Sequence, residues 1–115
     1  MAINYHLTKV HAISDNDMDF AKQIAELFLK EVPVEITNIR EGLEDKDYHR
    51  VYQGAHKIKP TLDLLGMEQA YEDVLAIEAW TRAEGKRKEI REVVKSLKDR
   101  VGATVKELKK DFNLK

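Results

Sequence analysis

The chain has 115 residues, of which 43% are apolar and 36% charged, and its formal net charge is −1. This length allows one compact core, and the balanced charge argues against a nucleic-acid binder. The absence of cysteine excludes disulfide and thiol chemistry, and no apolar run is long enough to cross a bilayer. We therefore expect a single domain over residues 1–115, located in the cytoplasm and without nucleic-acid or membrane partners.

The first half of the chain predicts a short N-terminal segment followed by two helices. The apolar residues of the N-terminal segment are Ile3, Tyr5, Leu7 and Val10. The run from Ser14 to Asp17 offers several N-caps for the first helix. The apolar side of that helix carries Phe20, Ile24, Leu27 and Phe28. We expect it to end near Val32–Pro33, because proline is disfavoured inside a helix, and Pro33 to stand in the first turn of the next helix. The apolar side of this next helix carries Ile36, Ile39 and Leu43.

The second half predicts three further helices. The first covers residues 48–65, with Asp47 as its N-cap and Gly66 as its terminator. The next ends near Gly85, and the last runs from about residue 86 to about residue 111. Their apolar residues recur at helical spacing: Ala70, Val74 and Ile77, then Ile90, Val94, Leu97, Val101 and Leu108. Because each helix has one apolar stripe to bury, we expect an all-α fold, an antiparallel four-helix bundle with an additional N-terminal helical segment.

His56 is predicted to face solvent. At 100° per residue, the apolar residues of the helix over residues 48–65 fall within about 40° of one direction, and His56 lies about 140° away. These apolar residues are Val51, Ala55, Ile58, Leu62 and Leu65. An exposed imidazole offers a nitrogen nucleophile, and Lys57 and Lys59 add positive charge beside it. On this pattern alone, a surface histidine without a function remains the simpler interpretation.

The stretch "AHKIKPTLDLLG" resembles the histidine-containing phosphotransfer (HPt) domain family. The matching residues, in order and spacing, are His56, Lys57, Ile58, Lys59, Leu65 and Gly66. The similarity extends over "FLKEVPVEITNIREGLEDKDYHRVYQGAHKIK" and, later, "VLAIEAW". The resemblance implies a four-helix bundle with an N-terminal helical elaboration. It also implies a histidine that accepts a phosphoryl group from a phospho-aspartyl receiver domain, or passes one on, within a two-component phosphorelay.

The resemblance also implies the roles of individual residues. His56 would be the phosphoryl acceptor and Lys59 the basic residue near the phosphoryl oxygens, with Lys57 as a weaker assistant. Gln53, one turn before His56 on the same face, could donate a hydrogen bond to the phosphoimidazole. Partners would be response-regulator receiver domains or a hybrid histidine kinase. The divalent metal would lie on the receiver, so we expect no metal site and no cofactor here. We expect a monomeric phosphoryl carrier, not a self-sufficient kinase, because the chain has no glycine-rich phosphate loop.

Two residues depart from the family pattern. Pro60 stands where glycine is usual; it adds bulk and leaves the carbonyl of His56 without its helical donor. Because it lies on the solvent side, we expect a bend at residues 56–60 and a helix that continues beyond it. Asp63 is the second departure. Its carboxylate would oppose a phosphoryl group unless it pairs with Lys59, four residues away. With Tyr52 and His49, these two residues are the candidates for contact with a docking partner.

Three alternative interpretations compete with this one, and the residues argue against the first two. "HKIKPTL" has some features of a histidine-kinase dimerisation helix, but that family has an acid directly after the histidine, where Lys57 stands here. His49 and His56 share a face but lie about 10 Å apart along a helix, too far to bind one metal ion. Last, the chain could be a degenerate bundle that only docks receivers or serves a structural role, without phosphotransfer.

Overall fold

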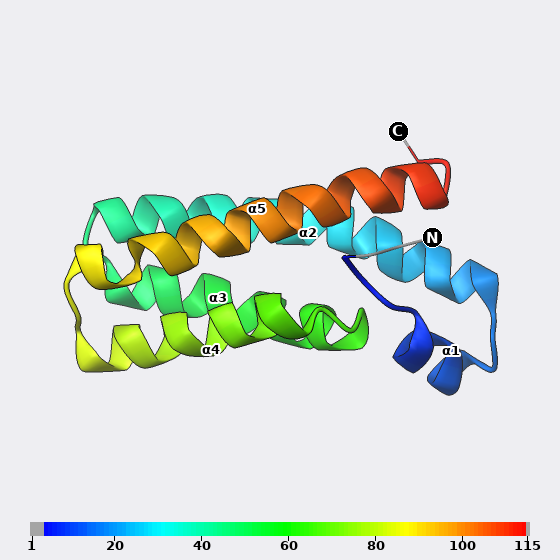
Figure 1. Cartoon of the computed structure of the whole chain (residues 1–115), viewed down its shortest axis with the longest axis horizontal. Helices are drawn as coiled ribbons and strands as arrows, with labels where there is room; N and C mark the ends of the chain where they lie inside the picture. Colours follow the sequence, from blue (N-terminus) through cyan, green and yellow to red (C-terminus); the bar gives the residue numbers. More distant parts are fainter. Residues whose placement is uncertain (1–3, 115) are drawn as a thin grey trace.

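A computed structural model describes residues 4–114, and helices are the regular secondary structure of this range, which contains no strand. The helices are α1 (Thr8–Ser14), α2 (Met18–Glu44), α3 (Tyr48–Leu64), α4 (Glu68–Ala83) and α5 (Arg87–Asp111). The four long helices form a bundle in which α2 packs on α3 and α5, and α4 packs on the same two helices (Figure 1). Short turns reverse the chain between them. The predicted helical bundle with a short N-terminal helix is therefore confirmed.

The predicted helix caps are present. The side chain of Asp17 accepts hydrogen bonds from the backbone N–H groups of Asp19 and Phe20 at the start of α2, and Asp47 accepts from Arg50 at the start of α3. Such caps satisfy N–H groups that have no partner inside the helix. Beyond α3, Gly66 has a φ of +65°, a left-handed conformation that glycine adopts without strain. The boundaries of α3 are therefore set by local sequence.

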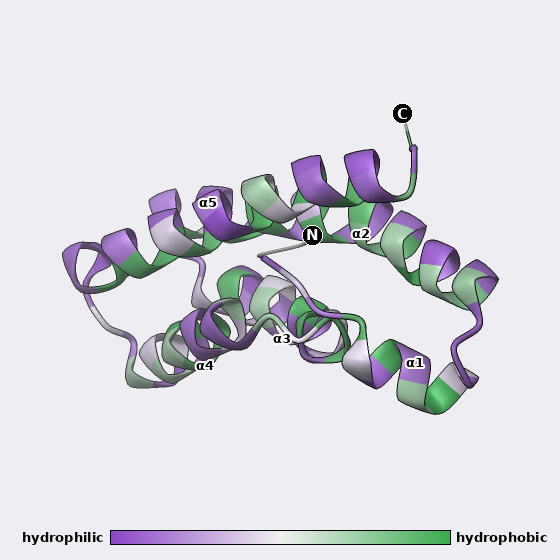
Figure 2. Cartoon of the chain, turned by 45° about the vertical axis from the view of Figure 1, so that its right-hand side comes forward, coloured by the Kyte–Doolittle hydropathy of each residue, from purple (hydrophilic) through white to green (hydrophobic). Residues whose placement is uncertain are grey.

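The core lies along the bundle axis, where the apolar stripes of the long helices meet. Its largest fully buried side chains include Phe28 and Ile39 of α2, Ile58 and Leu62 of α3, Ile77 of α4 and Leu97 of α5. On α5 the hydrophobic residues lie on the side turned toward the bundle (Figure 2). Burial of one such side chain contributes about 1.5–3 kcal/mol, so this core is the main source of stability.

The predicted helix end near Val32–Pro33 is wrong, because α2 continues through Pro33 to Glu44. Val32 and Ile36, on either side of the proline, are both buried, so the apolar stripe continues in register across it. Interior proline costs about 3 kcal/mol, and burial of several side chains on both sides outweighs that cost. Leu27, expected on the apolar side, is 41% exposed.

The N-terminal segment closes one end of the bundle. Tyr5 and Val10 are buried as expected, while Ile3 lies outside the described residues. The hydroxyl of Tyr5 donates to the Asp111 carboxylate at 2.7 Å, and the backbone N–H of His6 donates to the Leu65 carbonyl at 2.7 Å. Within residues 4–114, no helix combines the length and the apolar character that spanning a membrane requires.

Candidate functional site

His56 projects from the solvent side of α3. Its side chain is 59% exposed, as the helical periodicity predicted. The five residues expected on the opposite face are all buried: Val51, Ala55, Ile58, Leu62 and Leu65. Tyr52, one turn before His56, stacks on the imidazole with ring centroids 5.5 Å apart and ring planes 12° from parallel. The ring is thus exposed but held in one orientation.

A buried carboxylate on α4 joins the imidazole to the neighbouring lysine. Oε2 of Glu78 lies 3.0 Å from Nδ1 of His56, and Oε1 accepts a hydrogen bond from Nζ of Lys59 at 2.9 Å. The Glu78 side chain is 3% exposed, whereas that of Lys59 is 24% exposed. Each oxygen of one carboxylate therefore orients one of the two side chains that the sequence singled out.

The electrostatics keep this carboxylate charged. Burial alone would raise the pKa of Glu78, but the hydrogen bonds from Lys59 and His56 outweigh burial and hold that pKa below its ordinary value. The same hydrogen bond to Glu78 raises the pKa of Lys59, although desolvation opposes it. At neutral pH the site therefore contains an ionised carboxylate and an ammonium group.

The charge of Glu78 determines which nitrogen of His56 is free. An ionised carboxylate can only accept hydrogen bonds, so in the neutral imidazole Nδ1 carries the proton and donates to Glu78. The lone pair then lies on Nε2. Within residues 4–114, Nε2 has no hydrogen-bond partner. The arrangement presents a nucleophilic nitrogen on the surface of the bundle.

Other predicted site residues lie on the surface around the ring. Gln53 and Pro60 are exposed on α3, and α3 continues past Pro60 to Leu64. His49 is exposed two turns before His56. In the part of the chain that the structure describes, no group of three or more histidine, cysteine or acidic side chains is arranged to hold a metal ion.

Lys57 and Asp63 have partners away from the imidazole. Nζ of Lys57 lies 3.2 Å from the carboxylate of Glu35 on α2. Asp63 pairs with Lys9 of α1 at 2.6 Å. The pair between Asp63 and Lys59, which their spacing allows, does not form, because Lys59 turns toward Glu78 while α1 brings another lysine to Asp63. The hydrogen bond to Asp63 also raises the pKa of Lys9.

Glu78 was not among the residues predicted to act at the site, yet the sequence contains a signal for it. Glu78 stands in the apolar stripe of α4, where Val74, Ile77 and Thr81 are also buried. A carboxylate in such a stripe is seldom buried without a charged partner, since desolvation of an unpaired charge is costly. The identity of that partner depends on which helix packs against α4.

Most of the helical bundle matches one known protein family. A family model described as the Hpt domain matches residues 23–109. This range includes His56, Lys59 and Glu78, whereas α1 lies before it. No curated protein and no solved structure matches the chain.

Proposed function

Because the chain belongs to the Hpt domain family, whose members take part in phosphotransfer within phosphorelays, we propose that His56 is the residue that carries the phosphoryl group. Hpt domains generally interact with receiver domains and histidine kinases. In the proposed reaction, His56 accepts a phosphoryl group from the aspartyl phosphate of a receiver domain and passes it to another receiver.

The exposed imidazole bound to a buried carboxylate is the observation that carries this proposal. The Nε2 lone pair attacks the phosphorus of the aspartyl phosphate, a nitrogen–phosphorus bond forms, and the bond from phosphorus to the aspartyl oxygen breaks. The receiver's carboxylate leaves with the electron pair. The ring then becomes cationic with its proton on Nδ1, where ionised Glu78 at 3.0 Å stabilises it. Transfer of this kind depends mainly on positioning and on charge neutralisation.

Lys59 has two roles in the proposal. It helps to keep Glu78 ionised, and its ammonium group adds positive charge on the His56 side of α3, where phosphoryl oxygens would lie. Gln53 would act as a hydrogen-bond donor from one turn away. Lys57 has a smaller role, because it is paired with Glu35. The divalent metal belongs to the receiver, and the carrier acts as a monomer in the cytoplasm.

The receiver would dock on the surface around the ring. Tyr52 and Pro60 supply apolar surface next to the imidazole, and His49 and Asp63 lie at its edges. Pro60 also motivates the second candidate function, a domain that docks receivers without phosphotransfer. Its pyrrolidine ring lies one turn beyond His56, at a position where the family usually has glycine.

Phosphotransfer can be tested with receiver domains from the same source. Each receiver is phosphorylated, mixed with the native chain, His56→Gln or His6→Gln, and the chain is assayed for an acid-labile, base-stable phosphoryl adduct. We expect the adduct on the native chain and on His6→Gln, because His6 is an exposed histidine outside the docking surface. The adduct should be absent from His56→Gln. Its persistence in that variant would assign another acceptor, and binding without any adduct on the native chain would favour the docking function.

A further inference from the structure

A second candidate interaction surface is the groove between α2 and α5. It has a volume of about 770 Å³ and is lined by two turns of each helix, together with Asp45 of the turn after α2 and the side chain of Arg50, which reaches it from the first turn of α3. Because α2 packs on α3 and α5, while α4 packs on the same two helices, this groove lies on the side of the bundle opposite the α3–α4 pair. His56 and Glu78 are on that α3–α4 pair. A molecule bound in the groove would leave the imidazole accessible.

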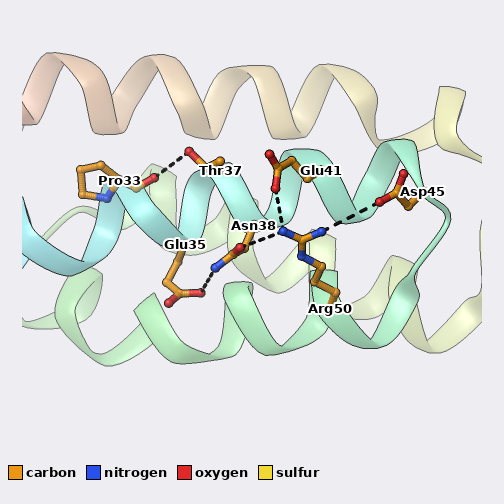
Figure 3. Close-up of polar contacts among 7 residues, drawn as sticks. All are labelled: Pro33, Glu35, Thr37, Asn38, Glu41, Asp45 and Arg50. Atoms are coloured by element: carbon orange, nitrogen blue, oxygen red, sulfur yellow. Dashed lines mark hydrogen bonds and ion pairs between the residues drawn. The ribbon is translucent and has the colours of Figure 1, made fainter.

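The carboxylates along the groove are already paired. Arg50 contacts Glu41 at 2.6 Å and Asp45 at 3.9 Å, as Figure 3 shows. Glu44 pairs with Arg87 at 3.0 Å. Three carboxylates therefore face two arginines at the end of the groove nearest the turn after α2, and each carboxylate has an arginine as its partner.

The remaining cations of the groove have no such partners. Arg40 of α2 and Arg91, Lys95 and Lys98 of α5 all line it, and none of them forms an ion pair within residues 4–114. This excess of unpaired positive charge stands on a chain whose formal net charge is −1. Charges of one sign along a groove attract a ligand of the opposite sign.

The spacing of these cations fits a helix. Arg91, Lys95 and Lys98 stand at positions i, i+4 and i+7 of α5, so they share one face over about 10 Å. We propose that the α2–α5 groove binds an acidic amphipathic helix of a partner protein, with carboxylates at the same i, i+4 and i+7 spacing. This interaction goes beyond phosphotransfer, because it uses neither His56 nor the surface around it.

The rim of the groove favours a protein segment over a nucleic acid. Glu41, Glu44 and Asp45 line one end of the same groove with one more negative charge than the two arginines supply. This local excess would repel a continuous phosphate backbone that runs along the groove. A helix can present its carboxylates one by one to the cations and turn neutral or basic residues toward the rim.

The test uses the full chain and a fluorescein-labelled helical peptide of alanines with glutamates at i, i+4 and i+7. A matched peptide carries glutamines at those positions. Fluorescence anisotropy should show saturable binding of the glutamate peptide that weakens as NaCl is added, and weaker binding of the glutamine peptide. The groove variant combines Arg91→Glu, Lys95→Glu and Lys98→Glu. The control combines Lys22→Glu, Lys30→Glu and Lys106→Glu, exposed residues outside the groove with the same charge change.

We expect the groove variant to bind the glutamate peptide at least about tenfold more weakly and the control to stay within about twofold of the native chain. Phosphorylation of His56 should be unchanged in both variants, so this proposal and phosphotransfer are tested separately. An equal loss of affinity for the glutamate peptide in the two variants would show that the net charge of the chain causes the effect, and it would overturn the proposal. So would the absence of peptide binding at low salt, or tighter binding of a single-stranded oligonucleotide than of the peptide.

Discussion

Replacement of Glu78 by glutamine tests how the imidazole of His56 is oriented. Glutamine has nearly the same shape as glutamate, but only one of its two terminal atoms can accept a hydrogen bond. If the amide oxygen keeps the contact with Lys59, the amide NH₂ group faces Nδ1 of His56. Nδ1 must then accept, so the proton moves to Nε2 and blocks the attacking lone pair. We therefore expect slower phosphotransfer with little change in the fold.

The two contacts of Glu78 set the size of the effect. They measure 3.0 Å to His56 and 2.9 Å to Lys59, and a hydrogen bond to a charged group contributes about 1.5–3 kcal/mol. Glutamine keeps part of this hydrogen-bond stabilisation, and its burial costs less than the burial of a carboxylate. We therefore expect the free energy of unfolding of Glu78→Gln to be about 1–2 kcal/mol lower than that of the native chain. In Glu78→Gln, the imidazole returns to the reactive tautomer only by breaking the neutral hydrogen bond between the new amide NH₂ group and Nδ1 of His56. This step costs about 1–1.5 kcal/mol and slows transfer about tenfold.

Three measurements address the rate, the tautomer and the stability that this prediction concerns. The initial rate of transfer from a phosphorylated receiver reports the chemistry, and the ¹⁵N chemical shifts of the imidazole report which nitrogen carries the proton. Urea unfolding gives the change in stability. Glu35→Gln is the matched control, because it removes the same charge from the carboxylate that pairs with Lys57, the neighbour of His56. The control should keep the native tautomer and should transfer no more slowly than the native chain, because it releases Lys57 and leaves the contact between His56 and Glu78 intact.

The reasoning is refuted if Glu78→Gln transfers within about twofold of the native rate while its imidazole tautomer is unchanged. A rate loss of similar size in Glu35→Gln would also refute it, because general loss of negative charge would then explain the effect.

Two further predictions concern stability. Because the folded-state pKa of Glu78 is lowered, its ionised form contributes stability that is fully present above the ordinary value of 4.5 and is lost as pH falls through the folded-state value. Urea unfolding should therefore show that the difference in free energy of unfolding between the native chain and Glu78→Gln narrows as the pH is lowered below 4.5, and a difference that does not change with pH would contradict this. A Cβ at Gly54 would lie 2.9 Å from Cγ1 of Ile39, so Gly54→Ala should lower the midpoint of thermal unfolding, at a cost of about 1–3 kcal/mol. Gly102→Ala has open space and should stabilise α5 by about 0.5–1 kcal/mol; stabilisation by both substitutions would disprove the close approach of α2 and α3.

Local sequence was sufficient to predict much of this molecule. The caps at Asp17 and Asp47, the turn at Gly66 and the exposure of His56 follow from residue type and helical period alone. They could be predicted because each depends on a few residues close in the sequence. The all-α bundle follows as well, since every long helix has one stripe to bury.

Tertiary packing decided the continuity of α2 and the ion pairs around α3. Pro33 would end an isolated helix, but burial on both sides of it keeps α2 intact. Asp63 and Lys59 stand at a spacing that suits a pair, yet each finds a partner on another helix, Lys9 for the first and Glu78 for the second. Propensity and spacing rules describe single helices, and they fail where a neighbouring helix supplies a stronger interaction.

The sequence by itself determined that an imidazole with lysines beside it stands on the surface of a helix. Only the tertiary structure determined that Glu78, 22 residues away on α4, holds both His56 and Lys59. The physical reason is that this contact depends on the packing of α4 against α3, which brings a buried charge and its two partners together across the helix interface. No periodicity within one helix contains that information.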